Sequence, residues 1–427
     1  MTLDRRAFTL ALGSAVGALA TGCRSTDPAA APTLQAAPDA IARLRPLPAP
    51  PPPIGDDERR ARVASAQRRM REAGLDAVVL EPGASMTYYQ GVAWWPSERP
   101  FLAVIPAAGE VAFVCPGFEE ARARELVRLT GDVRVWQEDE SPYRVVAGVL
   151  RDRGAAAGRL GIEEELRFFV VDGLRGVLPA ATLVSAEAVT SGDRMRKSAA
   201  ELALMQRATD ITAHAHRAVL PLLREGVTQE EVAALLVSAQ ERMGGADAWA
   251  LVAFGAASAF PHGSTQPQRL REGDVVLMDV GCGFGGYQSD VTRTTVFGTA
   301  SARQREIWAL ERRAQDAGLA AARLGATCAS VDAAARGVIT DAGMGPDYRV
   351  PGLPHRTGHG IGLQGHERPY IVRGNDTVLE PGMCFSIEPN ISIYGEFGVR
   401  LEDCVYMTEE GPRLFSPQMP SIDRLYP

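Results

Sequence analysis

Apolar residues recur every three or four positions between about Ser198 and Leu223, and this periodicity predicts a long amphipathic helix. Further helix starts are marked by a Ser or Thr that can cap the helix, in two cases with Glu or Gln three residues later: Thr228 with Glu231, Ser301 with Gln304, and Ser330. The helix after Thr228 is expected to end near Met243. The second half of the chain is therefore expected to contain four helices.

Residues 56–188 alternate helical and strand-like segments. Helices are predicted from Asp56 to about Arg71 and around residues 118–129, and short apolar runs predict strands at 76–80, 101–105 and 111–115. This alternation is typical of an α/β domain. No catalytic motif occurs there, and Trp94 and Trp95, in a loop flanked by Gly and Pro, either cover a ligand site or belong to a satellite of the core.

The first 23 residues have the pattern of an export signal. Arg5 and Arg6 precede an apolar run of 14 residues, Ala7 to Ala20, which is shorter than the roughly 20 residues needed to span a bilayer. The arginine pair resembles a twin-arginine signal, and Ala-Thr-Gly-Cys resembles a lipoprotein box in which Cys23 is acylated. We therefore expect an exported, periplasmic protein, anchored to the membrane through Cys23 unless the signal is simply cleaved.

Residues 24–55 are rich in proline, with nine prolines between Pro28 and Pro53. This composition favours extended polyproline II, and we expect a tether. Residues 56–192 and 193–427 are then two folded domains. The formal net charge of −7 gives no reason to expect nucleic-acid binding. Five cysteines besides Cys23, without close spacing, predict buried thiols instead of a disulfide framework.

An internal repeat carries four carboxylates. Asp279 follows Gly273 by six residues, and Glu388 follows Gly382 by six residues, and in both cases the acid is expected inside an apolar run that predicts a buried strand. A second acid follows each, Asp290 after 11 residues and Glu402 after 14, beyond glycine-rich stretches that predict hairpins.

Carboxylates on apolar strands are costly to bury unless a cation neutralises them. Four carboxylates brought together by two related hairpins have room for two divalent ions. The alternative, in which all four acids face solvent, fits poorly because their neighbours are apolar.

Four of the six histidines lie in two short stretches, one with His262 and one with His355, His359 and His366. Gly358, Gly360 and Gly362 around His359 are expected to let the backbone approach a metal or substrate closely. The other two, His214 and His216, lie on the long helix and are expected to be solvated or packed.

These residues resemble the creatinase and aminopeptidase P family of "pita-bread" metalloenzymes, which includes Xaa-Pro dipeptidases. The resemblance rests on five motifs and extends weakly back to Asp56: Met-Asp279-Val-Gly, Ser-Asp290-Val-Thr-Arg, Thr-Gly-His359-Gly-Ile-Gly-Leu, Ser-Ile-Glu388-Pro and Val-Arg400-Leu-Glu402-Asp. It implies an α/β (α+β) fold, with a creatinase-like N-terminal domain and a C-terminal pita-bread domain with a pseudo-twofold repeat. It also implies that the metal ligands are Asp279, Asp290, His359, Glu388 and Glu402, with a hydroxide between the metals.

By the same resemblance, His262 and His366 contact the scissile carbonyl, and His355 and Arg400 line the substrate pocket. The oxygen-rich ligand set favours two Mn ions, with Fe, Co or Zn as alternatives. Glu388 is a candidate for passing a proton to the leaving nitrogen. Arg400, two residues from Glu402, is expected on the same strand face.

The function expected from these residues is cleavage of the Xaa-Pro bond at the N-terminus of peptides or dipeptides. Two alternatives are the same metal site acting on a small non-peptide substrate, and a binding module without catalysis. A small peptide is the expected partner, nucleic acid is not, and a homodimer or higher homo-oligomer is expected.

Overall fold

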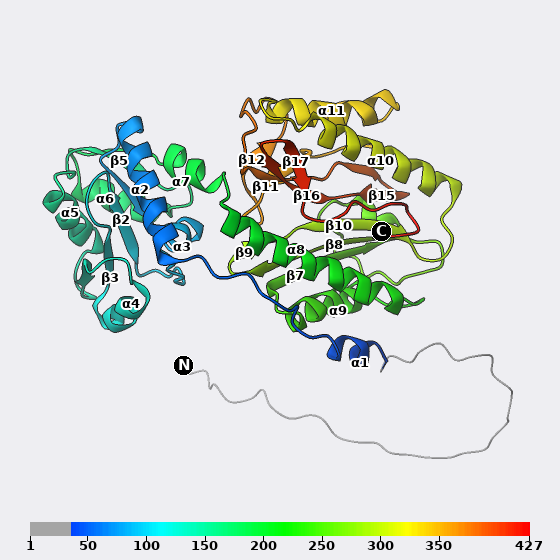
Figure 1. The fold of residues 1–427 in the computed structure, drawn as a ribbon, viewed down its shortest axis with the longest axis horizontal. Helices are drawn as coiled ribbons and strands as arrows, with labels where there is room; N and C mark the ends of the chain where they lie inside the picture. Colours follow the sequence, from blue (N-terminus) through cyan, green and yellow to red (C-terminus); the bar gives the residue numbers. More distant parts are fainter. Residues whose placement is uncertain (1–35) are drawn as a thin grey trace, which may run out of the picture.

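The structure is a computed structural model that describes residues 36–427. The expected signal, including Arg5, Arg6 and Cys23, lies outside the described residues. Within residues 36–427, no helix combines the length and apolar character needed to cross a membrane. The described chain forms two domains joined near the end of α7 (Figure 1).

The N-terminal domain is built on a six-stranded sheet with the order β4-β3-β2-β1-β5-β6. β1 is antiparallel to β2 and parallel to β5. The strand bounds are β1 Ala77–Leu80, β2 Leu102–Pro106, β3 Ala112–Pro116, β4 Val133–Trp136, β5 Arg159–Ile162 and β6 Thr182–Ser185. The three strands that the sequence predicts are therefore present, and they form the middle of the sheet.

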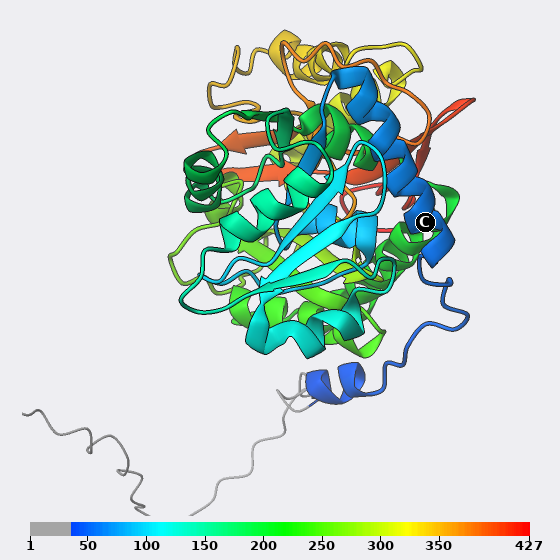
Figure 2. The same ribbon diagram turned by 90° about the vertical axis from the view of Figure 1, so that its left-hand side faces the viewer.

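Both faces of this sheet are covered by helices (Figure 2). In β1, Val78 and Leu80 pack into one apolar cluster and Ala77 and Val79 into the other, because successive side chains of a strand point to opposite faces. The helix bounds are α2 Asp56–Ala73, α3 Ala84–Gln90, α4 Glu120–Leu126, α5 Pro142–Asp152, α6 Phe168–Val177 and α7 Glu187–Arg194. The helix expected around 118–129 is shorter than predicted, since Gly117–Glu119 form a 3-10 turn, η1, before α4.

The C-terminal domain begins with two helices packed on an antiparallel sheet of order β10-β8-β7, to which β9 adds at β8. The capping boxes at Ser198 and Thr228 are both formed, so the long helix and its successor begin where the sequence predicts. The bounds are α8 Ala199–Val219, η2 Leu220–Leu222, α9 Gln229–Arg242, β7 Ala246–Phe254, η3 Gly255–Ala259, β8 Val275–Phe284, β9 Tyr287–Gln288 and β10 Val291–Val296.

The second half of this domain repeats the arrangement with two helices on a sheet of order β12-β11-β13-β16-β17. A separate hairpin, β14–β15, lies between β13 and β16 in the chain. The bounds are α10 Ala302–Ala321, α11 Cys328–Asp341, β11 Gly358–Gly360, β12 Glu367–Ile371, β13 Cys384–Ile387, β14 Asn390–Ile393, β15 Phe397–Arg400, β16 Asp403–Thr408 and β17 Gly411–Leu414. In Figure 1 the helix pairs α8–α9 and α10–α11 lie on opposite sides of the strands, which agrees with the pseudo-twofold repeat.

One predicted cap is wrong. The hydroxyl of Thr327, not that of Ser330, caps α11, and it accepts a hydrogen bond from the Ser330 backbone N–H at 3.2 Å. Both residues have a side chain suited to the position, and the helix begins at the earlier one.

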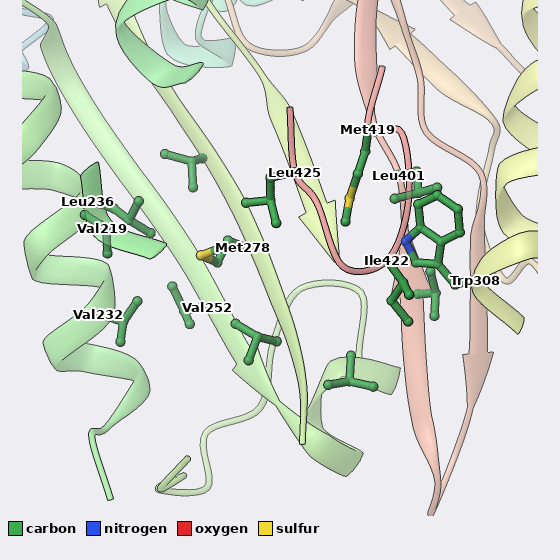
Figure 3. Close-up of a cluster of buried hydrophobic side chains, with 14 of the residues drawn as sticks. Val219, Val232, Leu236, Val252, Met278, Trp308, Leu401, Met419, Ile422 and Leu425 are labelled. Atoms are coloured by element: carbon green, nitrogen blue, oxygen red, sulfur yellow. The ribbon is translucent and has the colours of Figure 1, made fainter. Parts of the chain in front are cut away.

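The largest core cluster of the C-terminal domain includes the end of the chain. Figure 3 shows Val232 and Leu236 of α9 beside strands β7 and β8, and the C-terminal residues Met419, Ile422 and Leu425 near Trp308. The C-terminal segment therefore closes the core that α8 and α9 form with their sheet. All five cysteines of the described chain are free and buried, as the sequence predicts: Cys115, Cys282, Cys328, Cys384 and Cys404.

The proline-rich segment is not a free tether over its whole length. Residues Ala36–Ala42 form a short helix, α1, beside α9 (Figures 1 and 2). Ile41 is 2% exposed within the core cluster, and Leu47 N–H donates to the Met243 carbonyl at 3.2 Å. The expectation of an extended tether is therefore wrong for Ala36–Ala42, which are helical, and Leu47 is tied to the C-terminal domain, because a few apolar residues among the prolines pack on its surface.

Candidate functional site

A cavity of about 550 Å³ lies in the C-terminal domain, where the two sheet halves meet. All nine residues that the sequence singles out for the site line this cavity: His262, Asp279, Asp290, His355, His359, His366, Glu388, Arg400 and Glu402. Trp249, Ala250 and Leu251 of β7 add an apolar wall that the sequence does not predict.

Strand alternation places Asp279 in the cavity. Asp279 lies in the middle of β8, paired with Leu251 on β7 and Thr292 on β10. Its neighbours Met278 and Val280 point to the other face and pack in the core under α8 and α9. The apolar run around Asp279 is thus the core face of a strand whose opposite face presents the carboxylate.

The other three carboxylates lie at strand ends. Asp290 directly precedes β10, Glu402 directly precedes β16, and Glu388 follows β13 instead of lying inside it. The Glu402 backbone N–H donates to the Thr292 carbonyl of β10 at 3.1 Å, which ties the two halves of the domain together at the site. The ends of these three strands and the middle of β8 therefore converge on the cavity.

His359 on β11 presents one ring nitrogen to this cluster. Its Nδ1 lies 3.1 Å from the Gly360 carbonyl, which can only accept, so Nδ1 carries a proton and Nε2 is the nitrogen that can face a metal ion. Nε2 lies 3.1 Å from Glu388 Oε1, 3.7 Å from Asp290 Oδ2 and 3.9 Å from Glu402 Oε1. This is the orientation of a histidine that ligates through Nε2.

The glycines beside His359 have a different reason from the one expected. A Cβ at Gly358 would lie 1.9 Å from the Ser386 carbonyl oxygen, and one at Gly360 would lie 2.3 Å from that of Arg368. These glycines therefore allow β11 to pack closely between its two neighbouring strands, and the close approach is to protein backbone.

The cluster is electrostatically incomplete. Four carboxylates share the cavity with two guanidinium groups, those of Arg356 and Arg400, of which Arg400 pairs with Asp279. Three carboxylate oxygens are buried without a hydrogen-bond partner among the described residues: Asp279 Oδ1, Asp290 Oδ1 and Glu402 Oε1. Burial, and then the neighbouring carboxylates, raise the pKa values of Asp290 and Glu402 well above their usual range. Groups of three potential ligand atoms, such as His359 with Glu388 and Glu402, lie within 4.8 Å of one another. These oxygens fit divalent cations, and two such ions carry as many positive charges as the four carboxylates carry negative ones.

Glu388 differs from the other buried acids. Burial raises its pKa, but the adjacent His359 together with His355 and Arg400 outweighs this effect, so the pKa of Glu388 is lowered overall. The Ser386 hydroxyl also donates to Glu388 Oε1 at 3.0 Å. Glu388 therefore remains a carboxylate at neutral pH.

Arg400 is anchored in the cavity wall by three contacts of its guanidinium. It ends β15 and pairs with Asp279, while its Nη1 donates to the Pro261 carbonyl at 2.8 Å. The expectation that Arg400 and Glu402 share one strand face is wrong, because Glu402 lies in the break before β16. Both side chains nevertheless meet at Thr292, whose hydroxyl accepts from Arg400 Nε at 3.1 Å and donates to Glu402 Oε2 at 2.6 Å.

Sequence reasoning missed Thr292 and Ser386. Both are fully buried hydroxyl residues, and each bonds a carboxylate of the cluster. The sequence did offer a signal: Thr292 lies two residues after Asp290, and Ser386 lies two residues before Glu388. In an extended chain, residues two positions apart point to the same face.

The remaining histidines surround the cluster. The ring of His366 stacks on that of His359 with centroids 3.7 Å apart, and desolvation together with His359 lowers the pKa of His366 to about 4. Burial lowers the pKa of His355, whose Nδ1 lies 2.7 Å from the Arg356 carbonyl. His262 lines the cavity from the loop after η3.

Other aromatic residues named from the sequence lie elsewhere. His214 is exposed, whereas His216 is buried, and its Nδ1 lies 2.8 Å from the Tyr426 hydroxyl oxygen. Trp94 stacks on Phe101 with centroids 4.2 Å apart, and Trp95 is 81% exposed. Trp94 is thus part of a satellite core, and Trp95 projects from it.

Known proteins similar to this chain are metallopeptidases and dipeptidases, which agrees with a cavity suited to metal ions. Residues 203–409 match the model of metallopeptidase family M24, and residues 62–196 match the creatinase/prolidase N-terminal domain. The chain is 38% identical over 354 residues to a probable dipeptidase, PepE, of Mycobacterium tuberculosis, covering 82% of this chain and 92% of that protein. It is 33% identical to an Xaa-Pro dipeptidase of Lactobacillus helveticus over 357 residues, 82% of this chain and 95% of that one.

Solved structures agree with these sequence relatives. The crystal structure of dipeptidase PepE from Mycobacterium ulcerans superposes with a TM-score of 0.82 at 34% identity, over 88% of this chain and all of that chain. The similarity therefore spans both domains, and the carboxylate cavity lies within the part that matches the peptidase family. The chain belongs to metallopeptidase family M24, with a creatinase-like domain preceding its pita-bread domain.

Proposed function

We propose that this metallopeptidase holds two divalent ions and cleaves the bond before proline at the N-terminus of Xaa-Pro peptides or dipeptides. The observation that carries the proposal is the cluster of four carboxylates and His359, in which buried oxygens have no partner within the described chain. The similarity to the Xaa-Pro dipeptidase of Lactobacillus helveticus supports proline specificity.

Asp279, Asp290, His359, Glu388 and Glu402 would hold the ions. Carboxylate oxygens with one imidazole form a hard ligand set, which favours Mn, with Fe, Co or Zn as the alternatives to test. When bound, two such ions supply hydroxide near neutral pH and polarise the scissile carbonyl.

The protein groups around the cluster perform the remaining steps. Glu388 is ionised and lies in the cavity, so it takes the proton from the attacking water and passes it to the leaving proline nitrogen. His366 is neutral at pH 7 and therefore retains one N–H, which donates to the oxyanion that develops on the carbonyl oxygen. His262 lines the same cavity and is the second candidate donor.

The substrate ends meet two further side chains. The unpaired Nε2 of His355 faces no partner among the described residues, and as a neutral imidazole protonated on Nδ1 it accepts a hydrogen bond there. Arg400 holds Asp279 and, through Thr292, Glu402, and its remaining N–H groups are available to a substrate carboxylate.

We further propose that the chain is exported by the twin-arginine route and anchored through an acylated Cys23, and that it assembles as a homo-oligomer. The basis for export and anchoring is the sequence pattern before residue 24, and the homo-oligomer is an expectation that the oligomeric state in solution tests. Twin-arginine export of a folded chain would let Mn enter before copper or zinc competes outside the cytoplasm.

The test compares hydrolysis of Ala-Pro with that of a longer Ala-Pro peptide and of matched peptides in which Ala replaces Pro, all with Mn added. Cleavage of only the proline-containing substrates is the expected result. A protein that holds two metal ions but leaves every Xaa-Pro peptide intact would contradict the proposal and favour a small non-peptide substrate. Metal analysis of the same preparation distinguishes this outcome from an unloaded enzyme.

A further inference from the structure

The loop that carries His366 is held from the N-terminal domain. It joins β11 to β12 and leads from Gly362 to Glu367. Arg194, the last residue of α7, contacts it on both sides of the histidine: Nη2 donates to the Gln364 side-chain oxygen and, at 2.6 Å, to Glu367 Oε2. One guanidinium thus brackets His366.

These contacts are buried. The side chains of Arg194 and Glu367 are 9% and 6% exposed, and Lys197, which is 1% exposed, donates to the other oxygen of Glu367 at 2.7 Å. Arg194 Nη1 also donates to Ser85 on α3 at 3.3 Å, which fixes the guanidinium to the N-terminal domain. Charge-assisted hydrogen bonds of this kind, away from water, define position more strictly than exposed ion pairs do.

Apolar packing holds only the first part of the loop. Leu363 packs against two core clusters, but Gly365 and His366 are exposed at the cavity rim. A second cavity of about 160 Å³ separates this part of the loop from Glu163 and Glu164 of the N-terminal domain. The position of His366 therefore depends on the stacking of its ring on His359 and on the polar contacts on either side of it in the chain.

We propose that Arg194 is a positioning residue for His366, through which the creatinase-like domain sets the geometry of the reaction. The inference rests on the proposed role of His366 as an oxyanion donor. A donor contributes to catalysis only when it lies within hydrogen-bond reach of the developing charge, and small misplacements are costly.

The test is a double-mutant cycle with Arg194→Lys and His366→Ala, assayed on an Xaa-Pro peptide. Lysine keeps the charge beside Glu367 but lacks the fork that reaches Gln364 at the same time. We expect Arg194→Lys to lower kcat about tenfold with KM, Mn content and Tm nearly unchanged. His366→Ala should lose about 100-fold or more in kcat while keeping metal and fold. In the His366→Ala background, Arg194→Lys should add less than about a twofold loss, because its effect passes through the missing ring.

Arg196→Lys is the matched control. Arg196 lies two residues further along and pairs with Glu380 at 40% and 45% exposure, so this change should leave kcat and KM unaltered. Gln364→Ala removes one side of the bracket, together with the hydrogen bond that Gln364 Nε2 donates to Glu165 at 2.7 Å, and leaves the buried Arg194–Glu367 pair intact. This variant takes the place of Arg194→Lys if Arg194→Lys does not fold. Wild-type kcat in both Arg194→Lys and Gln364→Ala would overturn the positioning role of Arg194. The same conclusion would follow if the losses from Arg194→Lys and His366→Ala were fully additive in the double mutant. Neither result would affect the proposed role of His366. A His366→Ala enzyme with wild-type turnover would also overturn the proposed role of His366.

Discussion

Thr292 offers a direct test of how the carboxylate cluster binds metal. Its hydroxyl donates to Glu402 Oε2 at 2.6 Å and accepts from Arg400 Nε at 3.1 Å, and the side chain is fully buried. Thr292→Val replaces the hydroxyl by a methyl group of similar size. The change therefore removes two hydrogen bonds at the site while preserving packing.

The magnitude follows from the kind of bond. A hydrogen bond to a charged group is worth about 1.5–3 kcal/mol, which corresponds to about 10- to 150-fold in an equilibrium constant. Without the hydroxyl, Glu402 loses the partner that orients it, and this loss falls on metal binding because Oε1 of the same carboxylate has no other partner. We therefore expect Mn affinity to fall about 10- to 100-fold, a typical effect of losing a group that orients a metal ligand.

The assay is titration of metal-free protein with Mn in competition with a chelator, followed by the peptide hydrolysis rate at saturating Mn. Thr294→Val is the matched control, since Thr294 lies two residues along the same strand, is equally buried, and bonds only the backbone of Arg400, donating to its carbonyl at 2.7 Å. The control should lower the free energy of unfolding by about 1–3 kcal/mol and leave Mn affinity within about threefold. Unchanged Mn affinity in Thr292→Val, or an equal loss in Thr294→Val, would refute the reasoning.

Three further predictions concern the metal, export and acid stability. Carefully prepared protein should hold about two ions per chain by elemental analysis, and Asp290→Ala and Glu388→Ala should each lose most of the metal, so retention of both ions in either variant would count against the ligand assignment. Replacing Arg5 and Arg6 by Lys-Lys should leave the protein in the cytoplasm on cell fractionation, and normal export of that variant would exclude the twin-arginine route. Burial lowers the pKa of His216 to about 3, so between pH 6.5 and 3 the unfolded chain binds a proton that the folded chain does not. Between pH 7 and pH 5 this residue should therefore lower the free energy of unfolding by about 2 kcal/mol. In urea unfolding, a His216→Gln variant should lose about 2 kcal/mol less than the wild type over the same pH change.

Much of the fold and of the site follows from local sequence. The helix after Ser198, the capping boxes at Thr228 and Ser301, and the strands of the first domain occur where predicted, because these signals involve residues only a few positions apart. The repeated turn, apolar strand and acid also sufficed to select the carboxylates that the structure brings together with His359.

Only the tertiary structure decided which side chains support that cluster. Thr292 meets Glu402 across 110 residues, Arg400 meets Asp279 across 121, and Arg194 meets Glu367 across 173. No local periodicity encodes such pairs, since they arise when separate sheets and domains pack against one another.

In the proline-rich segment, too, the sequence predicts the local character and tertiary contacts decide the packing. Its composition correctly disfavours a core of its own, yet Ile41 and Ile54 are buried because the surface of the C-terminal domain provides the apolar partners. The sequence by itself determined the local elements and the acids that a cation must neutralise, because both depend on near neighbours and on the cost of burying charge. The partners of Thr292, Arg400 and Arg194, and the docking of residues 36–54, were decided by tertiary packing, because hydrogen bonds and apolar contacts depend on distance in space and not on distance along the chain.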